Sequence, residues 1–210
     1  MDTTFVPVSS PITYFVPSSD IGDSWQLPSF DDSSWTNATS AVGFGYNGQV
    51  GAFIGENGDT RSVMFSQNTS IYLRFPFEIT DLNGVGSMQL KVKADDGFVA
   101  YLNGKEVAQF NSPETLTFNS SAPESEEVDA GEDFLNFIID TSSNLIVGEN
   151  ILAIHGLNRN ITNNDFILIS ELVGTQQDSS NTTTRGYFAT PSLNLPNGAP
   201  ALPPLSLIHI

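Results

Sequence analysis

The chain has no cysteine among its 210 residues. This absence excludes a disulfide framework, a thiolate nucleophile and a cysteine-based zinc site. Stability must therefore come from a packed core, and the chain has the material for one in 15 Phe, 5 Tyr and 2 Trp. Each buried aromatic side chain removes roughly 150–250 Å² from water. We therefore expect a domain that folds without a required cofactor.

Basic residues are also scarce, with seven Lys and Arg against 24 Asp and Glu and a formal net charge of −17. A nucleic-acid backbone is bound by clustered cations, so we expect no nucleic-acid partner. The same shortage disfavours attachment to anionic membranes. The acidic composition, rich in Ser, Thr and Asn, instead fits a soluble protein in a salty or calcium-containing medium, where charges are screened beyond about 8 Å.

Long apolar runs are missing, because no segment approaches the ~18 apolar residues of a membrane helix. We therefore expect no membrane insertion. The first residues, Met1 to Thr4, lack the basic and apolar regions of a signal peptide. We expect that Met1 is not the true start and that the chain belongs to an extracellular or cell-surface protein.

What the chain does have is a strict alternation of apolar and polar residues, which is typical of β-strands. The clearest strand is predicted over residues 71–79. Its inner face would carry Ile71, Leu73, Phe75, Phe77 and Ile79, and its outer face Tyr72, Arg74, Pro76 and Glu78. Pro76 indicates an edge or bulge position. Residues 87–94 alternate in the same way, with Leu90 and Val92 inward.

A β-hairpin is predicted around Asn103-Gly104, because an Asn-Gly pair between two apolar runs is the strongest short hairpin signal. Further strands are predicted at 12–16, 41–44, 62–65, 98–102, 105–110, 134–139, 151–157 and 166–173. At least eight short strands separated by Gly, Asn, Asp and Pro predict an all-β fold. We expect an antiparallel jelly-roll β-sandwich over residues 1–175.

The composition changes after this domain. Residues 176–184 are polar, and residues 191–204 hold five prolines. This pattern predicts a linker over 176–204, semi-extended where proline dominates, that leads to further domains of the same polypeptide. Residues 205–210 match the translation of a transposase adapter used in sequencing, so we expect this hexapeptide to be foreign to the protein.

Several motifs follow one another in order between residues 25 and 173. They are Trp25 with FDDSSW at 30–35, GFGY at 43–46, IYLR at 71–74 with Phe77, DDGFVAYLNGKEV at 95–107, GENILAIHGLN at 148–158, and Asp165-Phe166. This set resembles a family of galactose-binding-like jelly-roll modules found in large, multidomain secreted bacterial proteins. The resemblance implies a sandwich fold and a non-catalytic role, and it supplies no ligand.

Paired carboxylates stand at Asp95-Asp96, just before Gly97. They could be ligands of Ca²⁺, which takes six to eight oxygens, or they could form a turn that caps backbone amides. Six more carboxylates lie between residues 124 and 133 and would matter only if folding brings them beside this pair. We expect a structural Ca²⁺ held by Asp95 or Asp96 with backbone carbonyls. Asp31-Asp32 invites the same two interpretations, and there the turn is favoured.

The glycine-rich segment 43–58 combines aromatic and amide side chains, which is the chemistry that recognises sugars. Tyr46, Asn47, Phe53 and Asn57 are its candidate ligand-binding residues. The alternative is a long connection whose glycines only satisfy backbone geometry.

Catalytic residues are not recognisable. His155, in an apolar strand, is expected to be a hydrogen-bonded structural residue, and no nucleophile elbow accompanies it. The sequence favours a non-catalytic module of a larger extracellular protein that binds a carbohydrate or a cell surface. The alternative is a spacer or protein-interaction module without a small ligand. An autonomous hydrolase would need a pocket with two carboxylates, one with a raised pKa.

Overall fold

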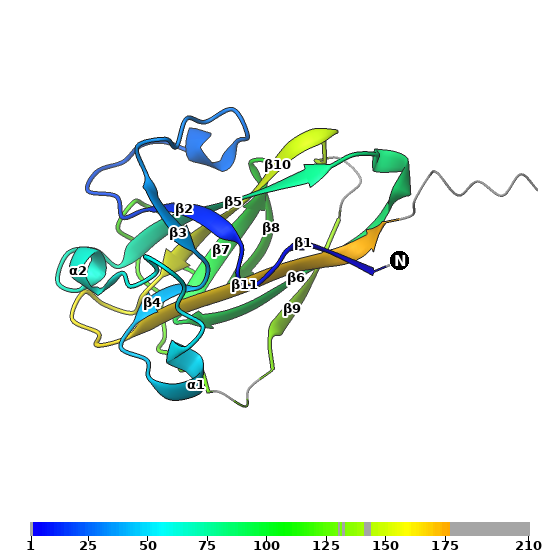
Figure 1. Ribbon diagram of the computed structural model, residues 1–210. Coiled ribbons are helices and arrows are strands. Elements are labelled where there is room, and N and C mark those ends of the chain that lie inside the picture. The colour runs from blue at the N-terminus through cyan, green and yellow to red at the C-terminus, as the bar shows by residue number, and fades with distance from the viewer. Residues whose placement is uncertain (1, 130, 132, 141–143, 177–210) are drawn as a thin grey trace, which may run out of the picture. The chain divides into compact units, whose positions relative to one another are not determined.

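A computed structural model of the chain describes residues 2–129, 131, 133–140 and 144–176. In this part of the chain the strands form two antiparallel sheets that pack face to face (Figure 1). The predicted antiparallel β-sandwich is therefore confirmed. The last strand ends at Gln176, and both the rest of the expected linker and the hexapeptide 205–210 lie outside the described residues.

The first sheet has the strand order β1-β11-β6-β9, and β4 also pairs with β11. Its strands are β1 (Asp2–Val6), β4 (Val42–Phe44), β6 (Val85–Asp95), β9 (Leu135–Ile139) and β11 (Phe166–Gln176). The second sheet has the order β3-β2-β5-β10-β7-β8. Its strands are β2 (Pro11–Phe15), β3 (Thr36–Thr39), β5 (Ser70–Ile79), β7 (Gly97–Leu102), β8 (Lys105–Phe110) and β10 (Gly148–Leu157).

Helices are few and short. The described residues contain two α-helical turns and two 3₁₀ turns: α1 (Gly48–Gly51), α2 (Arg61–Met64), η1 (Ser24–Gln26) and η2 (Leu82–Gly84). None of these helices has the length or the apolar content needed to cross a membrane. Figure 1 shows α1 and α2 toward the left of the sandwich.

The main core lies between the two sheets. The predicted inward set, Ile71, Leu73, Phe75, Phe77, Leu90 and Val92, is at most 5% exposed. The register expected from the alternation in β5 and β6 is therefore correct. Because side chains alternate strictly along a strand, a slip by one residue would have moved this entire set to the opposite face of its sheet.

The predicted hairpin joins β7 to β8. Leu102 pairs with Lys105 across the turn. Asn103 and Gly104 have φ angles of 49° and 89°. Two successive residues in the left-handed region are what a tight hairpin turn needs, and Asn followed by Gly supplies them with the least strain.

One predicted strand is wrong. Residues 62–65 were expected to be extended, and the structure places α2 at Arg61–Met64. The amides of Val63 and Met64 both donate to the carbonyl of Thr60, and Met64 is the buried anchor of the turn. Periodicity cannot separate a strand from a helical turn in so short an apolar run.

The outer face of β5 is only partly exposed to solvent. Glu78 and Pro76 are exposed, but Tyr72 and Arg74 are only 5% and 2% exposed. The segment 20–35 covers them and builds a second apolar cluster around Trp25 and Trp35 on this face. Alternation assigns residues to opposite faces of a sheet, but it does not reveal that a loop covers one of them.

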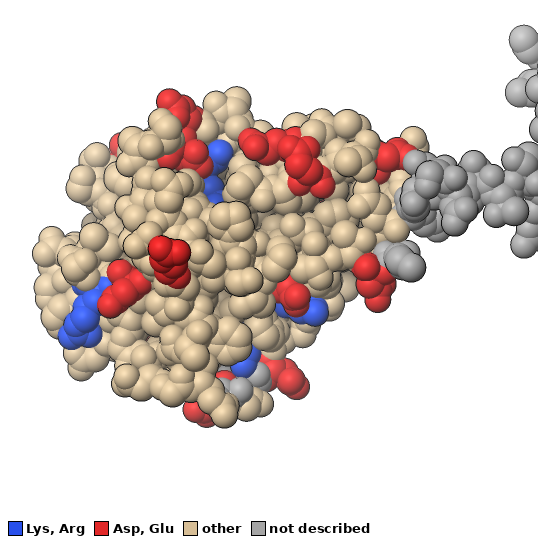
Figure 2. Space-filling view, in the orientation of Figure 1, with Lys and Arg blue, Asp and Glu red and all other residues tan. Residues whose placement is uncertain are grey.

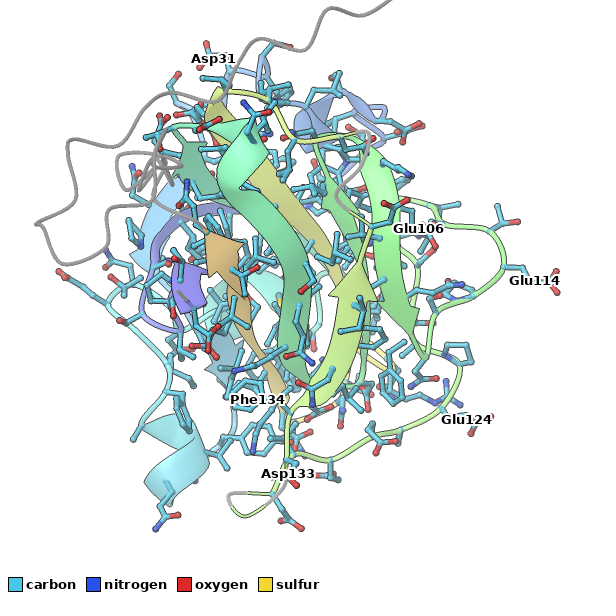
Figure 3. All side chains as sticks on the ribbon, turned by 90° about the vertical axis from the view of Figure 1, so that its right-hand side faces the viewer. Asp31, Glu106, Glu114, Glu124, Asp133 and Phe134 are labelled. Atoms are coloured by element: carbon cyan, nitrogen blue, oxygen red, sulfur yellow. The ribbon has the colours of Figure 1, made fainter. Side chains whose placement is uncertain are left out.

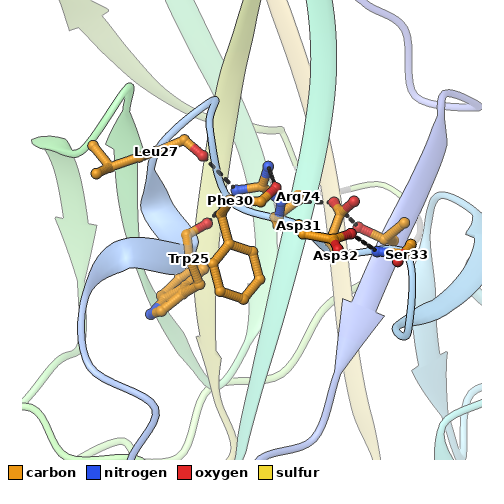
Figure 4. Close-up of polar contacts among 8 residues, drawn as sticks. Trp25, Leu27, Phe30, Asp31, Asp32, Ser33 and Arg74 are labelled. Atoms are coloured by element: carbon orange, nitrogen blue, oxygen red, sulfur yellow. Dashed lines mark hydrogen bonds and ion pairs between the residues drawn. The ribbon is translucent and has the colours of Figure 1, made fainter.

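The buried guanidinium of Arg74 holds this segment in place (Figure 4). Its Nε lies 2.7 Å from Oδ2 of Asp32, and Nη1 donates to the carbonyls of Trp25 and Leu27. The hydroxyl of Thr13 donates to the same Asp32 oxygen at 2.7 Å. Such contacts offset the large cost of removing a charge from water.

We predict that Asp32→Asn lowers the free energy of unfolding by about 2 kcal/mol, because it leaves the charge of Arg74 without its counter-ion. This figure lies below the range for a fully enclosed pair because the Asp32 side chain is 30% exposed. Urea unfolding at neutral pH measures the change.

The matched control is Asp31→Asn, which makes the same chemical change at the neighbouring, exposed residue. The Asp31 carboxylate is bonded only to the nearby Ser33, so the midpoint of this variant should stay close to that of the parent chain. Equal losses in the two variants would contradict the role given to Arg74.

Candidate functional site

Three neighbouring strands of the first sheet bring acidic residues together at one end of the sandwich. Asp95 is the last residue of β6, Asp165 immediately precedes β11, and Tyr46 lies two residues after β4. Pairing of Asp95 with Ile167 and of Phe44 with Phe166 aligns these strand ends. Carboxylate oxygens of Asp95, Asp165 and Glu127 all lie within 4.8 Å of one another. We call these three residues the acidic triad.

Gly45 allows this close approach. Its φ is +86°, and a Cβ at this position would lie 2.3 Å from the carbonyl oxygen of Asn164 and 2.7 Å from Cα of Asp165. A larger residue would push the chain after β4 away from β11. The glycine therefore sets the distance between Tyr46 and the triad.

The hydroxyl of Tyr46 links the parts of the site. It donates to Oδ2 of Asp95 at 2.7 Å, lies 3.4 Å from Oε2 of Glu127, and accepts the amide N–H of Val128 at 3.1 Å. These contacts attach the acidic loop between β8 and β9 to the sheet. Figure 3 shows Glu124 and Asp133 on this loop, at the lower edge of the molecule.

Asp95 is fully buried. Burial, together with the nearby charges of Asp96 and Asp165, raises the pKa of its carboxyl well above the ordinary value, against the lowering effect of the Tyr46 hydrogen bond. Its second oxygen, Oδ1, has no hydrogen-bond partner. A buried acceptor without a donor is unfavourable, so this oxygen is an unsatisfied polar atom of the site.

Asp96 is also buried, but its carboxylate is fully engaged. Oδ1 accepts the amide of Glu126 at 2.8 Å, and Oδ2 accepts the amide of Arg159. The Asp96 carboxylate therefore caps backbone amides, but these amides belong to two distant loops rather than to the hairpin. The acidic loop and the Asp pair do meet, as the sequence required for a cation site, but the carboxylate of Asp96 faces backbone amides.

The glycine-rich segment contributes in two different ways. Tyr46 is half-buried and bonded to Asp95, whereas Asn47, Phe53 and Asn57 are exposed. Asn57 reaches the carbonyl of Asn37 at 3.4 Å. The segment packs Val50 against Ala41, Ile167 and Ile169 on the outer face of the first sheet. Part of this segment is therefore a cover for the sheet.

A hollow of about 480 Å³ lies over the outer face of the second sheet. Trp25, Tyr72 and Tyr101 form its floor, and the exposed side chains of Asp20, Asp23 and Asn119 stand around it. Trp25 stacks on Tyr72 with ring centroids 4.2 Å apart and meets Tyr101 edge-on at 6.0 Å. Burial raises the pKa of both tyrosines to about 12, so both keep neutral hydroxyls.

Sequence reasoning missed this hollow, because its residues come from five separate segments: the loop before β3, the strands β5, β7 and β10, and the loop after β8. The only available signal was the arrangement of aromatic residues. Tyr72 and Tyr101 occupy outward positions on two strands that flank β10, while Trp25 lies in the covering loop.

His155 stands at the base of the hollow, edge-on to Tyr72 at 4.8 Å. Its Nε2 lies 2.8 Å from the hydroxyl of Ser70, which donates its own proton to the carbonyl of Ser120. His155 therefore carries its proton on Nε2 and acts as a donor. Burial lowers the pKa of His155 to about 3. This confirms the expected hydrogen-bonded structural histidine.

Comparison with solved structures finds similar proteins whose chains are much longer than this one. Bacteroides uniformis beta-glucuronidase 2 matches with a TM-score of 0.51 and 13% identity, over 83% of this chain and 18% of that chain. A beta-glucuronidase from an uncultured Clostridium sp. gives 0.48 and 11%, over 84% and 29%. The exo-beta-D-glucosaminidase CsxA gives 0.49 and 13%, over 83% and 20%.

At this level of identity the first similarity establishes the sandwich fold alone. The chain spans less than a third of the length of each of these proteins. No protein-family model matches the chain, and no curated protein matches it.

We predict that His155 makes the protein less stable as the pH falls from 6.5 toward 3. In this range the unfolded chain protonates the histidine and the folded chain does not, so unfolding takes up one proton. Above pH 6.5 the contribution is constant. The slope is about 1.4 kcal/mol per pH unit, which gives about 2 kcal/mol between pH 6.5 and pH 5.

The comparison variant is His155→Gln, which keeps a side-chain N–H donor for Ser70 but does not titrate. Denaturant unfolding at pH 7 and pH 5 should show a smaller loss of stability in the variant than in the parent chain. Identical losses would mean that the histidine is already protonated in the folded state.

Proposed function

We propose that this chain is a non-catalytic, galactose-binding-like module of a larger extracellular protein, and that it binds carbohydrate. The observation that carries the proposal is the aromatic hollow. Sugar rings combine apolar C–H faces with a rim of hydroxyls, and a site for them needs an apolar floor with a few polar groups around it. Trp25, Tyr72 and Tyr101, which are 2–9% exposed, line the base of the hollow, and Asp20, Asp23 and Asn119 supply acceptors.

The similarity to solved structures supports the same proposal. Bacteroides uniformis beta-glucuronidase 2, which matches with a TM-score of 0.51, is a carbohydrate-processing enzyme, and this chain spans 18% of it. A domain of this size within such a protein fits a module that accompanies other domains. The acidic surface in Figure 2, where acidic groups are spread out and outnumber basic ones, fits a neutral sugar better than an anionic one.

A non-catalytic role is supported by the burial of Asp95, the carboxyl with a strongly raised pKa among the described residues. Asp95 lies beside Glu127 and Asp165, so a carboxylate pair of the kind that a hydrolase needs is present. However, Asp95 is completely enclosed beneath Tyr46 and Val128. A substrate cannot reach a general acid in that position without opening the cover of the sheet.

A spacer or protein-interaction module is the second candidate, and exposed apolar groups favour it. Ile138 on the edge strand β9 is 71% exposed, and Val147 just before β10 is 63% exposed. Edge strands with exposed apolar side chains are surfaces on which another chain can pair.

A glycan array followed by calorimetry with the best-bound oligosaccharide tests carbohydrate binding. We predict that Asp23→Ala and Asn119→Ala each weaken binding at least about tenfold, equivalent to about 1.4 kcal/mol, through loss of a polar contact. Both residues are exposed, so the fold should be kept.

The matched comparison uses the glycine-rich segment, with Phe53→Ala and Asn57→Ala. Unchanged affinity in this pair assigns the sugar to the hollow. The opposite pattern would place the sugar at the segment that carries Asn47, Phe53 and Asn57. Absence of binding across the array, with circular dichroism showing folded protein, would favour the spacer.

A further inference from the structure

The acidic triad contains a carboxylate oxygen that the protein leaves without a donor. Asp95 is 0% exposed, and its Oδ1 has no hydrogen-bond partner, although Oδ2 is bonded to Tyr46. Buried polar atoms are nearly always satisfied, so an exception needs a physical reason. A bound cation, which is not part of the polypeptide, would supply such a reason.

The surroundings of Asp95 add negative charge. One carboxylate oxygen from each of Asp95, Glu127 and Asp165 lies within 4.8 Å of the other two. Carboxylates this close repel one another, and the repulsion is least screened at the buried Asp95. Strand register, Gly45 and Tyr46 hold the triad in this arrangement. The arrangement is electrostatically unfavourable by itself.

No ion pair of the triad with a basic side chain is recorded among the described residues. The two ion pairs recorded among the described residues, Arg74–Asp32 and Lys91–Glu171, both lie outside the triad. Lys93, two residues before Asp95 on the same strand face, is directed to the carbonyl of Asp129 and the ring of Phe134. Arg159 reaches Asp96 through its backbone amide.

We propose that the acidic triad is a calcium site, with Asp95, Glu127 and Asp165 as its carboxylate ligands. All the ligands are hard oxygens, and Ca²⁺ accepts six to eight of them in irregular geometry. Asp95 is the enclosed, fixed ligand, whereas Glu127 is exposed and Asp165 is half-buried. One side of the site is therefore open, so waters can complete the coordination shell.

The proposal changes the ligand set expected from the sequence. Asp95 remains a ligand, whereas Asp96 is not one because both of its oxygens accept backbone amides. Glu127 and Asp165, from distant loops, are the other two carboxylate ligands. The binding of Ca²⁺ would couple the acidic loop to the strand ends of β6 and β11. It does not depend on the sugar, so either proposal can fail without the other.

Isothermal titration of the chelator-treated 210-residue chain with CaCl₂ is the direct test, with thermal unfolding as a second readout. We expect saturable binding with a dissociation constant of roughly 0.1–1 mM, the range of exposed extracellular sites. The unfolding midpoint should rise with Ca²⁺, because the ion binds the folded state. Glu127→Gln should weaken binding at least tenfold, and Asp165→Asn should do the same.

The control is Glu126→Gln, which removes the same charge one residue away from a side chain outside the triad, and it should bind Ca²⁺ as the parent chain does. Since Glu127 and Glu126 are both exposed, both variants should fold. Three results would overturn the proposal: no heat or midpoint shift up to about 10 mM Ca²⁺, an equal midpoint rise with Na⁺ at matched ionic strength, or equal weakening in Glu126→Gln and Glu127→Gln.

Discussion

The buried guanidinium of Arg74 is the contact on which the second sheet's outer face depends. A charge in the middle of β5 must find partners, and it finds them in the carboxylate of Asp32 and in the carbonyls of Trp25 and Leu27. These partners lie on one loop, so satisfying the charge also fixes the path of that loop. Trp25 is thereby laid against Tyr72, and the hollow over the sheet acquires its floor.

The first sheet is covered by different kinds of contact. Its outer face is closed by the glycine-rich segment and the acidic loop, which meet at the hydroxyl of Tyr46. There the buried group is a carboxyl whose pKa is raised by burial, and the protein meets only part of its hydrogen-bonding needs. The two faces thus contrast a buried cation that is well paired by the chain with a buried acid whose second oxygen is unpaired.

Much of the fold could be predicted from local pattern. Alternation in residues 71–79 and 87–94 identified the core face, because the side-chain period of a strand is a local property. Asn103-Gly104 identified the hairpin for the same reason. The helical turn at Arg61–Met64 was missed because four residues hold too little periodic information.

The sites were predicted less completely, because they depend on non-local contacts. The sequence pointed to Asp95 and to the acidic loop, but Asp165 belongs to the triad only through the pairing of β11 with β6. The roles of Arg74 and Tyr72 could not be predicted from the sequence either, because alternation does not reveal which segment covers an outward face. His155 was predicted correctly because an apolar strand already implies a buried, neutral imidazole.

The placement of the tryptophans has a consequence for optical experiments. Trp25 and Trp35 are the only two in the chain, and both belong to the aromatic cluster outside the second sheet, with ring centroids 6.4 Å apart. The core between the sheets contains neither of them. Intrinsic fluorescence therefore reports the docking of the loop that Arg74 holds, whereas far-ultraviolet dichroism reports the strands. If the loop detaches before the sandwich opens, the two signals will separate, and a single-probe melting curve will describe only the layer it observes.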